Sequence, residues 1–220
     1  MKKIIELSGI TKTYYAQKKV VQPLKELSLH VYEGEFTAIT GGSGCGKTTL
    51  LNILGCLDRA DSGSYKFYDT ELQTLSAAGR GRFRRENIGF IFQSYNLLRE
   101  LTARQNVELA LKYKGVEKSK RAIFADAALK SVGMGEFADF FPDCLSGGQQ
   151  QRVAAARVFA CSPPLILADE PTGNLDKTNA DALLSILAGM RGERTTVIMI
   201  THSLDQAAKA DRVIPLKLGD

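Results

Sequence analysis

A glycine-rich segment between an apolar strand pattern and a helix pattern places the strongest constraint on how this chain can fold. Residues 41–48 have the spacing G-x-x-x-x-G-K-[ST]. Residues 35–40 before the segment fit a buried strand, and residues 49–54 after it fit a helix. A strand, a glycine-rich loop and a helix in this order are the context of a phosphate-binding loop. A plain glycine-rich turn is the alternative, and it would not require the complete Gly-Lys-Thr ending.

The residue types in this loop suit a polyphosphate. Glycines let the backbone turn tightly and point successive N–H groups inward, and the following helix offers unpaired N–H groups at its positive end. We expect Lys47 to reach the β- and γ-phosphates and the Thr48 hydroxyl to ligate Mg²⁺. The residues expected to hold the nucleotide here are Gly41, Gly42, Ser43, Gly44, Cys45, Gly46, Lys47, Thr48 and Thr49.

The composition is that of a globular protein without a membrane span. Hydrophobic residues make up 44% of the 220 and charged residues 24%, which is ordinary for a soluble domain. No apolar run reaches about 18 residues, the length that would suggest a membrane-spanning helix. Residues 1–6 meet charge too early to form the apolar core of a signal peptide. We therefore expect a cytoplasmic chain, to which a partner would supply any membrane spans.

A cluster of basic residues is a weak sign of nucleic acid or lipid headgroups. The formal net charge is +5, and Arg80, Arg82, Arg84 and Arg85 lie close together. Only Phe83 is interleaved with them, and the sequence has no DNA- or RNA-binding motif. We interpret the cluster as the solvated face of a helix and expect no nucleic-acid partner.

The cysteines do not predict a metal site or disulfides, because no C-x-x-C pair and no histidine at ligand spacing accompanies them. Three of them, Cys56, Cys144 and Cys161, are expected to be small buried hydrophobic residues. Cys45 differs because it lies beside Lys47 and a helix N-terminus, where the pKa of its thiol could be lowered. A small residue at a tolerant loop position is the alternative, which we favour. The cysteines are Cys45, Cys56, Cys144 and Cys161.

The remaining hydrophobic pattern alternates strands and helices, with one helix-rich interruption. Two alternating strands come first, with a hairpin tip at Lys18 and Lys19. After residue 93 roughly forty residues are rich in helix, which indicates an inserted helical subdomain, with Thr102 as an N-cap and Gly133 as a C-cap. The expected strands are 4–15, 20–32, 35–40, 65–68, 88–92, 165–170, 196–200 and 213–216, and the expected helices are 49–54, 72–86, 102–113, 118–132, 150–160, 179–190 and 205–210, with a turn at 61–64.

A second glycine-containing segment precedes another expected helix. Residues 145–149, with the sequence LSGGQ, lead into an alanine-rich helix that Ser146 can cap. Two glycines beside a helix N-terminus form another anion-binding device. A single domain rarely needs two such devices for one phosphate. We therefore expect the second device to serve a different copy of the nucleotide.

Two acidic residues and a histidine stand where expected buried strands end. Asp169 could hold Mg²⁺ and Glu170 could polarise an attacking water. His202 follows another strand and could touch a γ-phosphate. An ordinary Asp-Glu turn and a structural histidine are the alternatives. Tyr14, near the end of the first strand, could stack on adenine, although a strand tyrosine is usually a packing residue.

Taken in order, these segments resemble the ATP-binding-cassette ATPases over essentially the whole chain. The strings around them resemble the macrolide-exporter and lipoprotein-release subfamily. Cys45 and Thr48 stand where the family more often has serine, and Ser203 stands where it often has aspartate. The family motifs are matched by residues 41–48, Gln93, residues 145–149, 167–170 and 174–176, and His202, and the subfamily strings are residues 52–58, 88–98, 145–153 and 169–176.

The resemblance implies an α/β fold. It would have a P-loop NTPase core with a mixed central sheet, an N-terminal antiparallel β subdomain and an inserted α-helical subdomain. Residues 1–220 would form one nucleotide-binding domain. Within it, 1–93 and 141–220 would be the core with the β subdomain, and 94–140 the helical subdomain.

The resemblance also assigns roles to single residues. Tyr14 would stack on adenine, with Tyr15 as the fallback. Lys47 and the loop backbone would bind the phosphates, and Thr48, Gln93 and Asp169 would serve Mg²⁺ and its waters. Glu170 would be the catalytic base, and His202 would contact the γ-phosphate. The ATP held by the other subunit would be bound by Ser146, Gly147, Gly148 and Gln149, with Asp176 at the dimer seam.

The implied function is that of the ATP-hydrolysing subunit of a membrane transporter. Two copies would close around two ATP molecules and open after hydrolysis, driving export or extraction of a peptide, lipoprotein or antibiotic-like substrate. The helical subdomain would dock an integral-membrane permease at a groove around residues 90–98, on the inner face of the membrane. A regulatory cassette that signals through a membrane partner is the alternative. A soluble cassette for DNA repair or translation fits less well, since it would have coiled-coil inserts or a second cassette.

Overall fold

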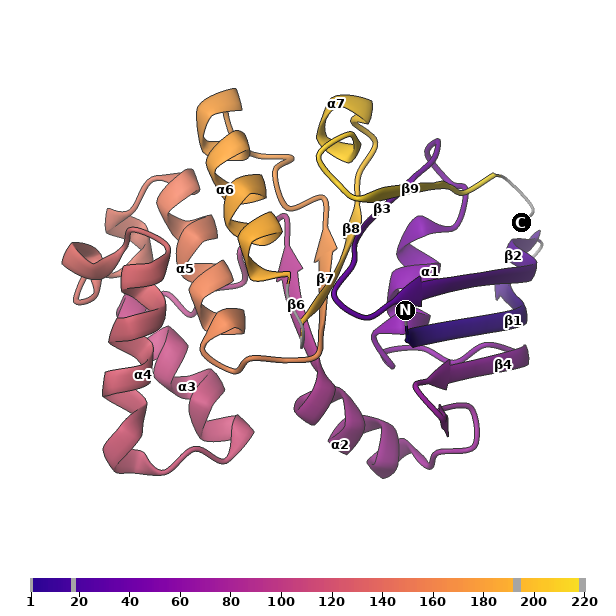
Figure 1. Ribbon diagram of the computed structural model, residues 1–220, viewed down its shortest axis with the longest axis horizontal. Helices are drawn as coiled ribbons and strands as arrows, with labels where there is room; N and C mark the ends of the chain where they lie inside the picture. Colours follow the sequence, from indigo (N-terminus) through magenta and orange to yellow (C-terminus); the bar gives the residue numbers. More distant parts are fainter. Residues whose placement is uncertain (1, 17–18, 192–194, 218–220) are drawn as a thin grey trace.

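The computed structural model describes residues 2–16, 19–191 and 195–217, so Lys18 of the expected hairpin tip lies outside the described residues (Figure 1). In chain order the elements are β1 (Lys3–Ala16), β2 (Lys19–Tyr32), β3 (Phe36–Thr40), α1 (Lys47–Leu54), β4 (Ser62–Phe67), β5 (Thr70–Glu71), α2 (Ala77–Asn87), β6 (Ile88–Phe92), α3 (Ala103–Lys114), α4 (Lys118–Ser131), the short 3₁₀ helices η1 (Gly135–Phe137) and η2 (Pro142–Cys144), α5 (Gly147–Phe159), β7 (Leu165–Asp169), α6 (Lys177–Met190), β8 (Thr196–Ile200), α7 (Leu204–Ala207) and β9 (Arg212–Pro215).

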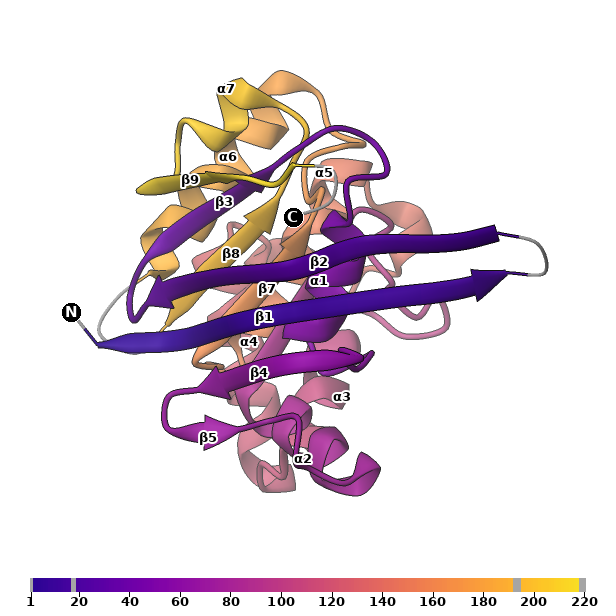
Figure 2. The same ribbon diagram turned by 90° about the vertical axis from the view of Figure 1, so that its right-hand side faces the viewer.

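The strands form two sheets with α1 between them (Figures 1 and 2). One sheet has the order β2-β1-β4-β5, and its described pairings are antiparallel. The other has the order β6-β7-β8-β3-β9, and its described pairings are parallel. This is the expected α/β fold, with the two kinds of pairing divided between two sheets.

The strands of the parallel sheet are short apolar runs because both faces of the sheet are covered. Every residue of β3 and β8 is buried. Alternate side chains of these strands pack on α1 on one face, and on α5 and α6 on the other. The sheet is therefore held rigidly between helices, and its carboxyl ends are fixed in position.

A third apolar cluster joins the helices α3, α4 and α5. Val107 of α3 and Leu129 of α4 meet Val153 and Ala156 of α5 in this cluster, while Val158 of α5 belongs to the cluster on the parallel sheet. One helix thus contributes to both cores. The division of the chain at residues 94–140 stays a prediction.

The turn expected at 61–64 is wrong. β4 begins at Ser62, which pairs with Thr11 of β1. Gly63 has a φ of +98°, and a Cβ there would lie 2.5 Å from the carbonyl oxygen of Gly9. The glycine therefore marks a close approach of two backbones within a sheet, where only glycine fits, and does not end the strand.

The helix expected at 72–86 begins later, at Ala77. The N–H of Leu72 donates to the carbonyl of Tyr65 at 2.8 Å, which continues the β4–β5 ribbon into the residues expected to start the helix. Ser76 then caps α2 with its side chain. The two-residue strand β5 lacks a hydrophobic pattern and is not predicted by the sequence.

The other elements agree closely with expectation. Thr102 caps α3 as predicted, and Gly133, with a φ of +70°, follows the C-cap of α4. The helix expected at 205–210 ends at Ala207. The N–H of Asp211 donates to the Phe36 carbonyl at 2.8 Å and draws the chain back to β3.

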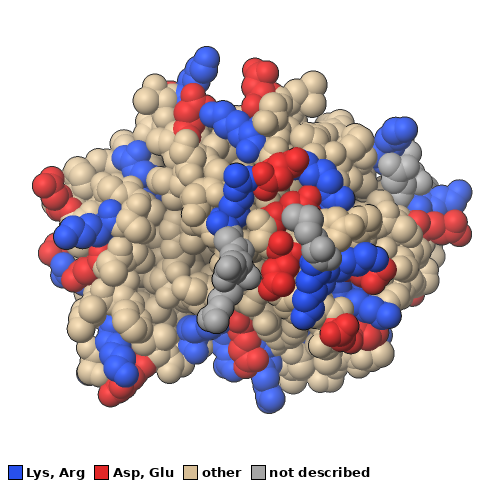
Figure 3. Space-filling model, in the orientation of Figure 1, with Lys and Arg blue, Asp and Glu red and all other residues tan. Residues whose placement is uncertain are grey.

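Positive and negative side chains are interspersed on the face of the molecule drawn in Figure 3. The basic excess is therefore not gathered into one field on this face. Among the helices in the described part of the chain, none has the length and hydropathy to cross a bilayer.

Candidate active site

The glycine-rich loop joins β3 to α1 at the carboxyl end of the parallel sheet. Gly44 and Gly46 have φ angles of +79° and +95°, in the left-handed region that glycine adopts without strain. A Cβ on Gly46 would lie 2.6 Å from the carbonyl oxygen of Pro23 in β2. The loop therefore reaches this shape, tight against the other sheet, only with glycine at this position.

The loop and the end of β7 line one cavity of about 310 Å³. It combines the N-terminus of α1, a lysine, a threonine hydroxyl and two carboxylates. A helix N-terminus with a lysine attracts phosphate, and carboxylates beside it attract a cation. The lining residues are Pro23, Ser43, Gly44, Gly46, Lys47, Thr48, Thr49, Asp169, Glu170 and Ile200.

Lys47 is folded onto its own loop. Its Nζ donates to the carbonyl oxygens of Gly41 at 2.7 Å and Gly42 at 2.8 Å. A phosphate would have to replace these carbonyls as the acceptor, and a charged acceptor forms the stronger hydrogen bond. Cys45 is only 4% exposed, and its Sγ lies 3.9 Å from the lysine Nζ. This burial supports the interpretation of Cys45 as a small packing residue.

Asp169 is a half-buried carboxylate at the end of β7. Burial raises the pKa of its carboxyl, the neighbouring Glu170 raises that pKa further, and Lys47 opposes both effects. A cation placed against such a carboxylate would favour its ionised form and oppose the rise in pKa. Because Thr48 and Asp169 line the same cavity, two of the three residues expected at a metal lie together.

Glu170 and His202 form a pair although they come from separate motifs. His202 Nδ1 lies 2.9 Å from Glu170 Oε1. Glu170 has a φ of +44°, a strained conformation for a residue with a side chain, which costs of order 1–3 kcal/mol. The backbone N–H of Glu170 donates to the Ile200 carbonyl at 3.0 Å. This bond holds the turn, and with it the carboxylate, against the end of β8.

Gln93, the third residue expected at a metal, does not line the cavity. Its side-chain Nε2 donates to Asn174 Oδ1 at 3.0 Å, and Asn174 Nδ2 donates to the Gln93 carbonyl at 3.2 Å. The two residues are therefore joined by one bond between their side-chain amides and by a second bond to the Gln93 backbone. Neither bond uses Gln93 Oε1, the side-chain oxygen that a metal or its waters would need.

The LSGGQ end of α5 and the turn before α6 lie side by side. Ser146 accepts from the N–H of Gln149 at 3.3 Å, and Gln149 Oε1 accepts from the N–H of Ser146 at 2.8 Å. Asp176 caps α6 by accepting from the N–H of Asn179 at 3.0 Å. A Cβ on Gly148 would lie 2.5 Å from Asn179 Oδ1, so the glycine allows the two helix starts to approach. Gly147 begins α5 directly after the cap.

Gln151 is a residue that the sequence reasoning missed. It is fully buried, and its Nε2 donates to the carbonyls of Phe92 at 3.2 Å and Pro171 at 2.7 Å. These carbonyls follow the ends of β6 and β7. A glutamine on the inward face of an alanine-rich helix is the only signal that could have indicated such a contact.

Tyr14 and Tyr15 lie on opposite faces of β1, as successive strand residues do. The Tyr14 hydroxyl donates to Asp58 Oδ2 at 2.7 Å, and it lies near enough to the side chain of Thr49, which lines the cavity, for that side chain to affect the pKa of the hydroxyl. Tyr15 is 81% exposed. The structure therefore brings Tyr14 to the site. The contact with Asp58 is not readable in the sequence, because 44 residues separate the partners.

Together the fold and the site define a class of protein. A parallel sheet whose first loop is glycine-rich and leads into a helix, with a carboxylate closing a neighbouring strand, is the arrangement of P-loop NTPases. The family model described as "ABC transporter" matches residues 24–173, more than half of the chain. The chain therefore belongs to the ABC transporter family.

Similar proteins agree with this family. The "Macrolide export ATP-binding/permease protein MacB" of Shigella sonnei (strain Ss046) and that of Escherichia coli (strain K12) are each 45% identical over 220 residues, which is 100% of this chain. The chain spans 34% of the length of these relatives.

Solved structures are similar over the whole fold. The dimeric post-hydrolysis state of the ATP-binding cassette MJ0796, bound to ADP and Pi, has a TM-score of 0.89 and 40% identity, covering 98% of this chain and 95% of that chain. A second dimeric MJ0796 structure, a bacterial ABC transporter cassette, has a TM-score of 0.89 and 41% identity with the same coverage. The predicted ATP-binding-cassette ATPase family, its fold class and its ATP binding are thus confirmed.

Proposed function

We propose that this chain is the ATP-hydrolysing subunit of a membrane transporter, and that two copies close around two ATP molecules. The proposal rests on one observation, which is that the N-termini of α1 and α5 do not line the same cavity. The start of α1 lines the cavity, whereas among the described residues none of 145–149 at the start of α5 lines it. A second copy placed head to tail would bring its own Ser146 end to the phosphates. The dimeric structures of the similar MJ0796 cassette support this arrangement.

Mg²⁺ is the metal that this site would take with ATP. The Thr48 hydroxyl and the Asp169 carboxylate, both in the cavity, are hard oxygen ligands of the kind that Mg²⁺ prefers. Burial raises the pKa of the Asp169 carboxyl, and a cation beside it would favour the ionised form. When bound, Mg²⁺ would neutralise part of the phosphate charge. Gln93 would join these residues through its side-chain Oε1.

The residues in the cavity supply the chemistry of hydrolysis. Glu170 would orient a water molecule and accept its proton as the water oxygen attacks the γ-phosphorus and ADP leaves. His202, within hydrogen-bond distance of the same carboxylate, would fix its direction and contact the γ-phosphate. Lys47 would exchange its carbonyl partners for phosphate oxygens.

We further propose an integral-membrane permease as the partner. The MacB relatives are named as ATP-binding and permease proteins, and this chain matches 34% of their length. A permease would hold the chain on the inner face of the cell membrane. The substrate would be a peptide, a lipoprotein or an antibiotic-like compound that is exported or extracted.

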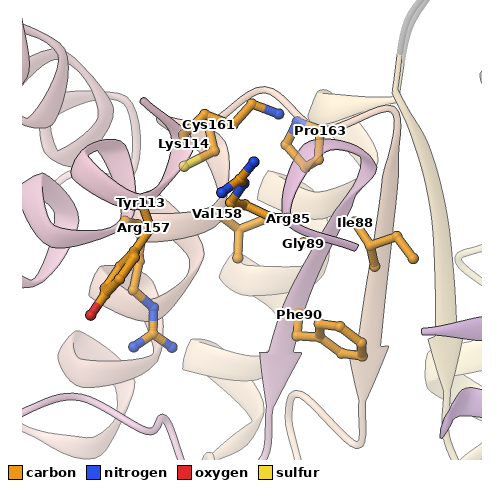
Figure 4. Close-up of a pocket in the computed structure, with 11 residues that line it drawn as sticks. Arg85, Ile88, Gly89, Phe90, Tyr113, Lys114, Arg157, Val158, Cys161 and Pro163 are labelled. Carbon is orange, nitrogen blue, oxygen red and sulfur yellow. The ribbon is translucent and has the colours of Figure 1, made fainter. Parts of the chain in front are cut away.

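A groove of about 210 Å³ between β6 and the helices α3 and α5 suits such a partner (Figure 4). Phe90 and Tyr113 give it an apolar lining, and Arg85 and Lys114 add positive charge, although Arg85 also pairs with Glu86. Among the residues that the structure describes, no Asp or Glu lines the groove. The third cation, Arg157, donates to the Asn96 and Tyr95 carbonyls. An amphipathic helix of the permease with carboxylates beside its apolar face would complement this groove.

The Glu170→Gln variant tests the proposed function. We expect it to bind ATP without turnover, because it lacks the group that accepts the proton. In Mg-ATP its mass in solution should double, and without nucleotide it should be a monomer. Light scattering after size-exclusion chromatography measures both states.

Lys47→Ala in the Glu170→Gln background is the matched control, since it removes a phosphate contact from the same site. It should remain a monomer in Mg-ATP. A Glu170→Gln protein that hydrolyses ATP at the wild-type rate would contradict the assignment of the base. A monomer with ATP demonstrably bound would contradict dimerisation by nucleotide alone.

A further inference from the structure

A buried lysine and an aspartate hold the ring of Tyr14 beside the loop cavity. Lys12 is only 9% exposed, and its Nζ donates to Asp58 Oδ1 at 2.9 Å and to the Arg59 carbonyl at 2.7 Å. The other oxygen of Asp58 accepts from the Tyr14 hydroxyl at 2.7 Å. The same lysine Nζ lies 5.2 Å from the centre of the Tyr14 ring. One carboxylate therefore ties down both the hydroxyl and the cation that covers the ring.

The pKa shifts of Asp58 and Tyr14 are consistent with the direction of the hydrogen bond between them. Burial would raise the pKa of the Asp58 carboxyl, but the bonds from Lys12 and Tyr14 outweigh burial, and the pKa is lowered. Burial and the bond to Asp58 raise the pKa of the Tyr14 hydroxyl. At neutral pH the carboxylate is thus ionised and accepts, and the hydroxyl keeps its proton and donates.

The held ring lies at the edge of the cavity that the phosphate loop lines. Thr49, whose side chain affects the pKa of the Tyr14 hydroxyl, and Pro23 of β2 both line that cavity. Tyr14 pairs with Val21 of β2, and Figure 2 shows β1 and β2 lying over α1. Lys12 covers one face of a ring that remains 38% exposed. The ring is therefore partly accessible to a planar ligand.

We propose that Asp58 and Lys12 are positioning residues that fix the Tyr14 ring as a platform for the base of the nucleotide. We call this group, Lys12, Asp58 and Tyr14, the ring clamp. The inference rests on the proposed function, since it takes ATP as the ligand. A ring whose orientation is fixed before binding loses less conformational freedom when a base stacks on it.

The segment that carries Asp58 also connects the ring clamp to the helix that follows the phosphate loop. Asp58 follows α1, whose first residue is Lys47, and Asp61 in the same segment accepts from the backbone N–H of Thr13 at 2.6 Å. The segment after α1 is thus attached to β1 on both sides of the lysine. The ring and the phosphate loop are thus connected through this segment, and a bound nucleotide would span the distance between them.

The test compares Mg-ATP with Mg-tripolyphosphate, which has phosphates and no base, by isothermal titration calorimetry. Tyr14→Phe keeps the ring and removes only the clamped hydroxyl. We expect it to weaken ATP binding by roughly three- to tenfold, the cost of ordering one side chain on binding, and to leave tripolyphosphate binding unchanged. Asp58→Asn should act in the same way. Tyr15→Phe, which removes an exposed hydroxyl on the opposite face, is the matched control and should change neither ligand.

A double-mutant cycle separates positioning from general support of the fold. If the hydroxyl and the carboxylate act as one clamp, Tyr14→Phe combined with Asp58→Asn should bind ATP no more weakly than the weaker single variant. Fully additive losses, or equal losses for ATP and tripolyphosphate, would overturn the clamp. Asp58→Asn removes the charged partner of buried Lys12 and could therefore fold poorly. Tyr14→Phe leaves that ion pair in place, so the test remains valid in that case.

Two further outcomes separate the clamp from the proposed function. If Tyr14→Ala weakens ATP binding and Tyr14→Phe does not, the ring is a platform but needs no clamp, and the inference is wrong. If the wild-type chain binds neither ATP nor tripolyphosphate, the proposed function fails and the clamp fails with it.

Discussion

At the scale of single residues, the half-buried carboxylate of Asp169 lowers the stability of the folded chain when no ligand is bound. Its folded-state pKa is raised, chiefly by burial, so the folded chain loses stability as the pH rises through that pKa. We expect Asp169→Asn to raise the melting temperature of the nucleotide-free protein at pH 7 by about 2–4 °C, the effect of roughly 1 kcal/mol in a chain of this size. Differential scanning fluorimetry measures it.

The pH dependence provides the control for Asp169→Asn. Well below the ordinary pKa of an aspartate the carboxyl is protonated in both the folded and the unfolded chain, so the advantage of the variant should disappear there. Mg-ATP should stabilise the wild type more than the variant. A variant that is less stable than the wild type at pH 7 would mean that Asp169 has a structural partner in the folded state.

The site residues that could be predicted are those whose position follows from a short local motif in the sequence. The helix N-terminus, Lys47 and Thr48 share one short motif, and Asp169 follows an apolar strand whose end must lie at the same edge of the sheet. The amide pair of Gln93 and Asn174 is different, because its members are 81 residues apart. Nothing local in the sequence determines which distant side chain such an amide will meet.

At the scale of elements, the chain contains two equivalent helix caps with different expected roles. Thr102 with Gln105 caps α3, and Ser146 with Gln149 caps α5, each with both hydrogen bonds of a capping box. Replacing either cap by alanine should lower the free energy of unfolding by about 1 kcal/mol, the usual cost of losing an N-cap. Chemical denaturation of the two variants measures this loss.

Only one of these caps should affect assembly. In the Glu170→Gln background, Ser146→Ala should weaken the ATP-dependent dimer by roughly tenfold or more, because a hydrogen bond to a charged phosphate is lost. Thr102→Ala should leave the dimer unchanged. Equal dimerisation by the two variants would contradict the role of α5 at the nucleotide of the partner copy.

Elements were predictable where their pattern is periodic and long. The errors at 61–64 and 72–86 share one cause, which is backbone pairing between segments close in space. Gly63 fits a turn by composition, but its missing side chain serves the contact with Gly9 across two strands. Local propensity carries no information about that contact, so the sequence alone favours the turn.

At the scale of the whole molecule, the groove of Figure 4 predicts which surface a permease uses. A synthetic helical peptide with leucines on one face and glutamates beside them should bind the wild-type chain. Arg85→Glu combined with Lys114→Glu should weaken binding by roughly tenfold, because two attractive charges become repulsive. Fluorescence anisotropy of the labelled peptide measures the affinity.

Arg82→Glu is the control for the groove, since Arg82 lies on the same helix as Arg85 but does not line the groove. It should bind the peptide nearly as the wild type does. The double charge reversal should also leave ATP-dependent dimerisation intact in the Glu170→Gln background. Equal peptide binding by the wild type and the double variant would place the docking surface elsewhere.

The buried amide of Gln151 anchors α5 at the carboxyl ends of two strands of the parallel sheet. Its two hydrogen bonds fix α5 to the ends of β6 and β7, while other residues of α5 lie in the cluster with α3 and α4. A rotation that keeps both bonds must turn about this point. Ser146 lies about 7.5 Å from it along the helix. A small rotation of α5 about this point would therefore displace Ser146 only slightly, so the contact expected with the nucleotide of the partner copy depends on how firmly these two bonds hold the helix.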